Sequence, residues 1–160
     1  MNTPRGRIAF AVCGSFCTLG TATAQAGRLV RQGWELLPVM SFAASRLAEA
    51  LVIAPCTGTT LARLAVGLSD TPVTLAAKSL LRVGCPVLIA VSTNDGLGAS
   101  GENIARLRQR KHYYFVPYGQ DDPAAKPQSL KADFALLPAA LEAALVGRQI
   151  QPLLRERIGA

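Results

Sequence analysis

The chain has 160 residues, of which half are apolar and 17% are charged, and its formal net charge is +7. This length predicts a single domain with a buried core, and the apolar content excludes a disordered chain. No apolar run reaches the roughly 20 residues that a membrane-spanning helix needs, so we expect no membrane segment. The residues before the first predicted strand lack the apolar segment of a secretory signal, which predicts a cytoplasmic protein.

The first half of the chain alternates predicted strands and helices. Small and aliphatic residues at Ala22, Ala26, Leu29 and Val30 form one face of the first helix, and Gly33 ends it. A proline inside the second strand predicts an edge position or a bulge. The predicted elements are a buried strand over 8–13, a helix over 18–32, a strand over 34–40, a short helix over 42–50 and a strand over 51–54.

The second half continues the alternation. Asp70 and Thr71 are the expected cap of a helix whose inner face holds Ala76, Leu80 and Val83, while Pro138 is expected in the first turn of the last helix. Residues 118–131 are predicted to be irregular, because they contain prolines and show no periodicity. The predicted elements are a helix from near Thr60, a helix from Pro72 to Gly84, a strand over 87–91, a helix over 103–110, a strand over 113–116 and a helix ending near Val146.

This order predicts an α/β fold, with a three-layer, Rossmann-like parallel sheet flanked by helices. We expect one domain over residues 1–150 and a C-terminal tail over 151–160. In such folds the ligand lies beyond the carboxyl ends of the strands. These ends supply Ser, Thr, Asn, Gly and Cys, so we expect a polar site there.

The most informative stretch follows the third predicted strand and reads Pro55-Cys56-Thr57-Gly58-Thr59-Thr60. A strand that turns into a helix at small hydroxyl residues presents free backbone N–H groups at the positive end of the helix dipole. Such a turn favours a phosphate or another anion. The alternative is a helix cap with nothing bound.

Two more strand ends carry candidate ligand-binding groups. Gly14 and Ser15 allow close approach of the backbone and offer a hydroxyl, although an ordinary tight turn explains them equally well. The stretch Ser92-Thr93-Asn94-Asp95-Gly96 follows a buried strand, and it is either a simple turn or a ligand-facing loop with Asn94 directed inward.

Catalytic groups are scarce in this sequence. His112 is the only histidine, and its place at a basic helix end predicts a surface role. The four cysteines have no zinc-type spacing and are expected to be reduced thiols, although Cys17 near a helix start could form a stabilised thiolate. Asp95, Asp121 and Asp122 are the carboxylates near strand ends. No catalytic triad or pair of acids is evident, so a bound cofactor would have to supply the chemistry.

The basic charge does not predict a nucleic-acid site. Arg106, Arg108, Arg110 and Lys111 close a predicted helix, where cations offset the negative end of the helix dipole. No aromatic residues are interleaved with them as a base-stacking surface would require. We expect a solvated basic face or a surface for an acidic partner subunit.

Several segments together carry a family resemblance. The chain resembles the flavoprotein superfamily of FMN-binding cysteine decarboxylases and flavin prenyltransferases, and within it the family of dipicolinate synthase B subunits. The matching segments are GSFCT (14–18), VIAPCTGTTLARLA (52–65), SDTPVTLAAKSLLR (69–82), STNDGLG (92–98), YYFVPYGQDDP (113–123), KPQSL (126–130) and GRQIQP (147–152).

The resemblance implies a flavoprotein fold, an oligomer, and an oxidoreductase that acts with a dehydrogenase-like A subunit. Together they would oxidise dihydrodipicolinate, a small heterocyclic dicarboxylate, to dipicolinate in the mother cell of a sporulating bacterium. FMN is the implied cofactor, with NAD(P) possible through the partner. The implied cofactor-binding residues are Gly14, Ser15, Phe16, Cys17, Ser41, Pro55, Cys56, Thr57, Gly58, Thr60, Ser92, Thr93 and Asn94.

The chain departs from the superfamily pattern in two ways. The decarboxylases rely on a histidine near the second strand, and this chain has none there. The segment between Ser41 and Leu51 is also shorter than the pattern leads us to expect, and a strand and part of the flavin pocket normally come from it. One alternative is a non-catalytic scaffold for the A subunit. Another is a flavin prenyltransferase, which the shared Thr-x-x-x-hydrophobic-Ala-x-Gly pattern from Thr60 to Gly67 suggests, and whose phosphate clamp would be Lys78 and Arg82.

Overall fold

The structure is a computed structural model, and it describes residues 5–13, 18–38 and 48–156. Most of the predicted helix over 42–50 and the end of the predicted strand over 34–40 lie outside these residues. The elements are β1 (Gly6–Ala11), α1 (Leu19–Arg31), β2 (Trp34–Pro38), β3 (Ala50–Cys56), α3 (Gly58–Val66), α4 (Pro72–Leu81), β4 (Val87–Thr93), α5 (Ala99–Arg108), β5 (Tyr113–Phe115), β6 (Tyr118–Gly119), β7 (Leu130–Ala132), a 3-10 turn (Phe134–Leu136) and α6 (Leu137–Leu145).

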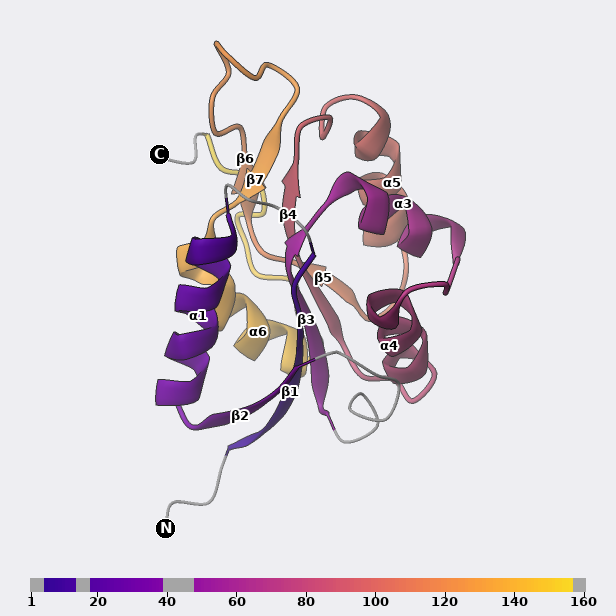
Figure 1. Cartoon of the computed structure of the whole chain (residues 1–160), viewed down its shortest axis with the longest axis vertical. Helices are drawn as coiled ribbons and strands as arrows, with labels where there is room; N and C mark the ends of the chain where they lie inside the picture. Colours follow the sequence, from indigo (N-terminus) through magenta and orange to yellow (C-terminus); the bar gives the residue numbers. More distant parts are fainter. Residues whose placement is uncertain (1–4, 14–17, 39–47, 157–160) are drawn as a thin grey trace.

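The strands of the described residues form one mixed sheet (Figure 1). Its parallel part runs β2-β1-β3-β4, with β5 beside the first half of β4. The far end of β4 pairs with β7 instead, and β7 with β6, both in antiparallel register. The predicted Rossmann-like α/β fold is confirmed. The expectation of a wholly parallel sheet is wrong for β6 and β7, which return along β4 as a short ladder.

The strand order places a topological switch between β1 and β3. The chain goes from β1 outward to the edge strand β2, then returns to the other side of β1 to form β3. Ligands of doubly wound sheets bind outside the carboxyl ends of the strands at such a switch. The edge position of β2 also accommodates Pro38, as predicted, because an edge strand can lack one donor.

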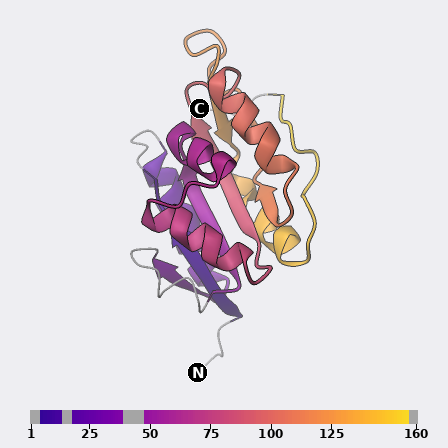
Figure 2. The same ribbon diagram turned by 90° about the vertical axis from the view of Figure 1, so that its right-hand side faces the viewer.

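Helices cover both faces of the sheet (Figures 1 and 2). Side chains alternate along each strand, so Leu51 and Ile53 join the core under α3, α4 and α5, whereas Val52 joins the core under α1 and α6. Leu61 and Leu141, one from each helical layer, are fully buried. Burial of one such leucine contributes about 1.5–3 kcal/mol, so the two apolar layers fix the sheet between them.

Several element boundaries differ from the predictions. Strand β3 continues through Pro55 and Cys56, and β4 through Thr93, so these residues belong to the sheet rather than to loops. Helix α4 is capped by Thr71, which forms a reciprocal capping box with Thr74. Asp70 takes no part in that cap, because its carboxylate pairs with Arg63 at 3.1 Å.

Val30 is predicted on the inner face of α1 with Ala22 and Leu29, but it is 55% exposed, whereas Ala22 and Leu29 are buried. The sequence predicts Val83 on the inner face of α4, but the helix ends at Leu81 and Val83 is 66% exposed. Pro138 lies in the first turn of α6, as predicted. The predicted irregular segment 118–131 is bounded by β6 and β7.

Residues 153–155, predicted to belong to a C-terminal tail, run beside β6. Tyr118 donates its N–H to the carbonyl of Leu153, and Arg155 donates to the carbonyl of Tyr118, each at 3.0 Å. Leu153 is buried against the core. In the part of the chain that the structure describes, we find no helix with the length and apolar character needed to cross a bilayer.

Candidate functional site

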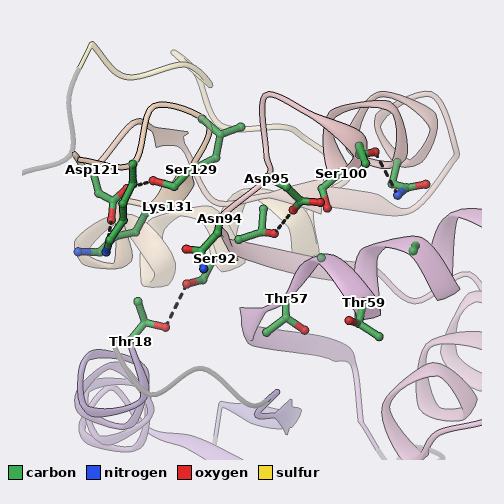
Figure 3. Close-up of a pocket in the computed structure, with 17 residues that line it drawn as sticks. Thr18, Thr57, Thr59, Ser92, Asn94, Asp95, Ser100, Asp121, Ser129 and Lys131 are labelled. Carbon is green, nitrogen blue, oxygen red and sulfur yellow. Dashed lines mark hydrogen bonds and ion pairs between the residues drawn. The ribbon is translucent and has the colours of Figure 1, made fainter. Parts of the chain in front are cut away.

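A cleft of about 570 Å³ opens beyond the carboxyl ends of β3 and β4 (Figure 3). Its size lies in the usual range for small-molecule sites. The start of α3 forms one wall, the end of β4 and the following loop form the floor, and the β6–β7 segment forms the opposite wall. The lining residues are Thr18, Thr57, Gly58, Thr59, Ala62, Ser92, Thr93, Asn94, Asp95, Ala99, Ser100, Asn103, Asp121, Lys126, Ser129, Leu130 and Lys131.

The α3 wall presents uncapped helix amides. Thr57 is the N-cap residue, with an extended backbone, and its side chain makes no capping hydrogen bond. Its carbonyl accepts the first helical hydrogen bond from Leu61 at 2.9 Å. The N–H groups of Gly58 and Thr59 precede the first possible intrahelical acceptor, so they have none within the helix. This wall can therefore donate to an anionic or polar ligand group.

Gly58 brings α3 against the floor of the cleft. A β-carbon at this position would lie 2.6 Å from Ser100 Oγ and 2.8 Å from Thr93 Oγ1. It would also lie 3.1 Å from Asp95 Oδ1. A side chain at position 58 would therefore require Ser100 and Thr93, or the wall itself, to shift, which favours glycine at this point of the predicted motif.

The floor is stiffened by a small hydrogen-bonded network. The Thr93 hydroxyl donates to Asp95 Oδ1 at 2.5 Å, and the Ser100 N–H donates to the Asp95 carbonyl at 3.2 Å. Hydrogen bonds from Thr93 and Ser100 to the carboxylate lower the pKa of Asp95. The carboxylate is thus ionised and already engaged, which suits it to hold the loop in place.

The opposite wall contains a second engaged carboxylate. The Ser129 hydroxyl donates to Asp121, and Lys126 Nζ lies 3.9 Å from the other oxygen of Asp121. Burial raises the pKa of Asp121, but the Ser129 hydrogen bond, the nearby backbone N–H groups and Lys126 together outweigh it, so the net pKa is lowered. Lys131 follows on β7 in register with Ser92.

Thr18 connects the start of α1 to this floor. The hydroxyl oxygens of Thr18 and Ser92 lie 3.2 Å apart and share a hydrogen bond (Figure 3). Thr18 directly follows the predicted cofactor-binding residues Gly14, Ser15, Phe16 and Cys17. Those four and Ser41 lie outside the described residues.

The other predicted site residues divide into two groups. Thr57, Gly58, Ser92, Thr93 and Asn94 line the cleft. Pro55, Cys56 and Thr60 do not line it. Pro55 and Cys56 are buried in β3, and the Thr60 hydroxyl donates to Cys13 Sγ at 3.3 Å. Burial raises the pKa of the Cys13 thiol, more than the hydrogen bonds lower it, so this pair is a structural support rather than a reactive group.

Sequence reasoning missed most of the wall formed by residues 121–131. The sequence indicates Asp121 only as a carboxylate near a strand end, and Lys126, Ser129 and Lys131 fall within the segment predicted to be irregular. The alternation of Leu130, Lys131 and Ala132 is the only local signal of a strand, and three residues are too few to establish a period.

Other candidate groups lie away from the cleft. His112 is exposed and follows α5 with a φ of 68°, and it does not line the cleft. Lys78 and Arg82, the residues considered for a prenyl phosphate clamp, are at the end of α4 and do not line it either. No group of three or more metal-ligating side chains occurs among residues 5–13, 18–38 and 48–156.

The doubly wound sheet and its strand-end cleft define an α/β protein of the flavoprotein type. The model of the Flavoprotein family matches residues 6–132, and the chain belongs to this family. It is 36% identical to the B subunit of dipicolinate synthase of Bacillus subtilis (strain 168), over 98% of this chain and 97% of that protein. The crystal structure of the corresponding B subunit from Bacillus halodurans is 35% identical, with a TM-score of 0.90, and covers 99% of this chain and 100% of that one.

More distant structures share the fold alone. The FMN-dependent cysteine decarboxylase SpaF is 22% identical, with a TM-score of 0.67 over 91% of this chain and 98% of that one. DmrB of Burkholderia xenovorans, solved in complex with FMN and described as a cubic protein cage for redox transfer, is 18% identical, with a TM-score of 0.63 over 91% and 98%.

The match to the Bacillus subtilis protein also reveals a difference in length. The alignment spans 194 residues, whereas this chain has 160. At least 34 aligned positions therefore have no residue in this chain. This difference has the direction that the sequence predicts, and its place between Ser41 and Leu51 stays a prediction.

Proposed function

We propose that this chain acts as the B subunit of a dipicolinate synthase. The proposal rests on two relatives of that description, which match nearly the whole chain at 36% and 35% identity. The reaction is the oxidation of dihydrodipicolinate to dipicolinate, in which the ring loses two electrons and two protons. The chain acts with a dehydrogenase-like A subunit in the mother cell during sporulation.

The cleft is the proposed site of FMN. The fit rests on its donors, since uncapped amides at the start of α3 and the hydroxyl of Thr57 suit the polar groups and the phosphate of a nucleotide. Gly58 lets the start of α3 pack directly against Thr93 and Ser100 on the floor of the cleft. When bound, FMN would supply a two-electron acceptor. NAD(P), held by the partner subunit, is the proposed final acceptor.

The residues of this chain would position the reactants. Asn94 lies at the end of β4 and offers both a donor and an acceptor to a ring nitrogen or a carboxylate. The Asp95 network holds the Asn94 loop, because its carboxylate is fixed by Thr93 and Ser100. These roles are orientation and exclusion of water, and the described cleft contains no histidine or cysteine to act as a base or nucleophile.

Reconstitution with the partner tests this function. The purified chain is incubated with FMN, freed of unbound flavin, and assayed with the dehydrogenase-like subunit for formation of dipicolinate by its ultraviolet absorbance. The proposal predicts that dipicolinate forms faster with the chain present. An unchanged rate, together with the absence of a stable complex between the two proteins, would overturn it.

A non-catalytic scaffold is the second candidate function. It is favoured by the shorter chain, because at least 34 positions of the alignment with the Bacillus subtilis relative have no residue here. If the chain is a scaffold, it forms a complex with the partner and activates it, and the cleft contributes nothing to this activation. Substitution of Thr57, Thr60 and Asn94 by Ala separates the two functions, because a scaffold keeps its effect on the partner and a flavoprotein subunit loses it.

A homo-oligomer is also proposed, because DmrB, which shares this fold, is described as a cubic protein cage. The number of copies is measured by light scattering of the purified chain, with and without its partner. A chain that stays monomeric in both conditions would contradict this part of the proposal.

A further inference from the structure

Four charged side chains line the cleft, and three of them are already engaged. Asp95 accepts the Thr93 hydroxyl, and Asp121 accepts the Ser129 hydroxyl. Lys126 lies beside Asp121, at 3.9 Å. The fourth is Lys131, which forms no ion pair with any carboxylate of the described residues. The cleft thus holds one cation that has no anionic partner within this part of the protein.

The backbone of Lys131 is held firmly at this position. It lies on β7, which is hydrogen-bonded to β4 on one side and β6 on the other, opposite Ser92 and Gly119. Its neighbours Leu130 and Ala132 are buried, with exposed fractions of 8% and 0%. Lys131 is itself half-buried, so part of its stem is fixed while the cleft remains open to its ammonium group.

The two walls of the cleft both attract anions. Figure 3 shows Lys131 on the same side as Asp121 and Ser129, across the cleft from Thr57 and Thr59. The uncapped start of α3 lies on that far side, and Asn94 and Ser92 lie between. In the proposed function the start of α3 holds the flavin, so the wall that contains Lys131 is the one left to receive a substrate carboxylate.

We propose that Lys131 binds one carboxylate of a small heterocyclic dicarboxylate ligand. This inference rests on the proposed function, and it names the residue that recognises the substrate and product class. An ammonium–carboxylate contact in a partly desolvated cleft is a charge-assisted hydrogen bond, which strengthens binding about tenfold or more. A flavin phosphate offers the same oxyanion chemistry, so the experiment must separate the two sources.

Equilibrium binding to the full chain provides the test. Isothermal titration measures the dissociation constants of pyridine-2,6-dicarboxylate, pyridine-2-carboxylate, FMN and riboflavin. The variants are Lys131→Gln, Lys131→Arg and the matched control Lys78→Gln, which removes the same charge from α4 outside the cleft. We expect Lys131→Gln to weaken the dicarboxylate about tenfold or more, Lys131→Arg to retain most of the affinity, and Lys78→Gln to bind as the natural chain does. Pyridine-2-carboxylate, which carries one such carboxylate, should also lose affinity in Lys131→Gln.

Three outcomes would overturn the assignment. The first is no binding of the dicarboxylate to the natural chain, and the second is equal dicarboxylate affinity in Lys131→Gln and Lys78→Gln. The third is a loss of affinity for FMN but not for riboflavin or the dicarboxylate, which would assign Lys131 to the flavin phosphate. The proposed function can fail separately from this assignment. In that case the dicarboxylate binds through Lys131, but the chain does not make the partner form dipicolinate faster.

Discussion

Gly58 at the start of α3 lies so close to Ser100 on α5 that an added β-carbon would be 2.6 Å from the Ser100 hydroxyl oxygen. The same β-carbon would be 2.8 Å from Thr93 Oγ1. Such contacts are shorter than packed atoms tolerate, so the wall and the floor of the cleft meet only because residue 58 has no side chain.

Gly58→Ala should therefore destabilise the protein by about 1–3 kcal/mol and weaken any ligand held between α3 and β4. Urea unfolding and ligand titration measure the two effects. The control is Gly20→Ala in α1, where nothing lies within 4 Å of an added β-carbon, and where stability should be unchanged or slightly higher. Equal stabilities of the two variants would contradict the close packing at Gly58.

A second prediction concerns the pH dependence that Asp95 gives to stability. Its pKa is lowered in the folded protein by the Thr93 and Ser100 hydrogen bonds. The ionised carboxylate therefore stabilises the fold fully above the unfolded pKa of about 3.9, and this contribution is lost as the pH falls through the lower folded value.

Thr93→Val removes the main donor and should raise the pKa of Asp95 toward its ordinary value. The free energy of unfolding should then be lower than that of the natural chain at pH 7, and the difference should shrink as the pH falls below about 4. Urea unfolding across this pH range measures it. Thr21→Val, at an exposed position of α1, should show no such trend. If the free energies of unfolding of Thr93→Val and the natural chain differed by the same amount at every pH, the role of the hydrogen bond would be refuted.

A third prediction concerns the contact between Arg110, just beyond α5, and the end of α3. The Arg110 guanidinium donates to the carbonyls of Leu64 and Ala65 in the last turn of α3, at 3.1 Å and 2.6 Å. A basic side chain in this position satisfies terminal carbonyls and offsets the negative end of the helix dipole. Arg110→Ala should reduce the free energy of unfolding by about 1–2 kcal/mol, whereas Lys111→Ala, an exposed neighbour, should have little effect. Chemical denaturation of both variants checks this, and equal losses would show that general charge rather than the cap is responsible.

A fourth prediction concerns the order in which the described thiols react. Cys13 and Cys56 are buried, and burial raises the pKa of both. Cys85 is only partly buried, although burial raises its pKa as well. Iodoacetamide at about pH 8, followed by mass spectrometry, should modify Cys85 before the other two, and denatured protein should react without this order. Modification of Cys56 at the rate of Cys85 would contradict the buried position in β3.

The fold was largely predictable because its core elements carry strong periodicity. The continuous apolar runs at β3 and β4 predict the sheet, and the spacing of Leu61, Leu64, Ala65 and Leu68 predicts the inner face of α3. The first three are buried, whereas Leu68 lies beyond the end of α3 and is 48% exposed. The boundaries were less accurate. The sequence predicts that the third strand ends before Pro55, yet β3 continues through Cys56, because the residues beyond the predicted end still pair with β4 at Val91.

Only half of the cleft could be predicted. The α3 wall and the β4 floor follow directly from one strand–turn–helix motif and one strand end, which are local in sequence. The wall that contains Asp121 and Lys131 depends on the antiparallel pairing of β7 with the end of β4. That pairing brings together residues about 40 apart in sequence through strands too short to show a pattern, so only tertiary structure reveals it.

Flavin binding by the cleft between α3, β4 and β7 underlies the proposed role in the partner's reaction. The purified chain is incubated with FMN, freed of unbound flavin, and its visible absorption spectrum is recorded with and without the partner. The Gly58→Ala variant is measured in the same way. We expect a bound flavin spectrum that saturates at about one FMN per chain and is strongly reduced in Gly58→Ala. A colourless protein in both conditions, or equal flavin uptake by the natural chain and Gly58→Ala, would show that the cleft is not a flavin site.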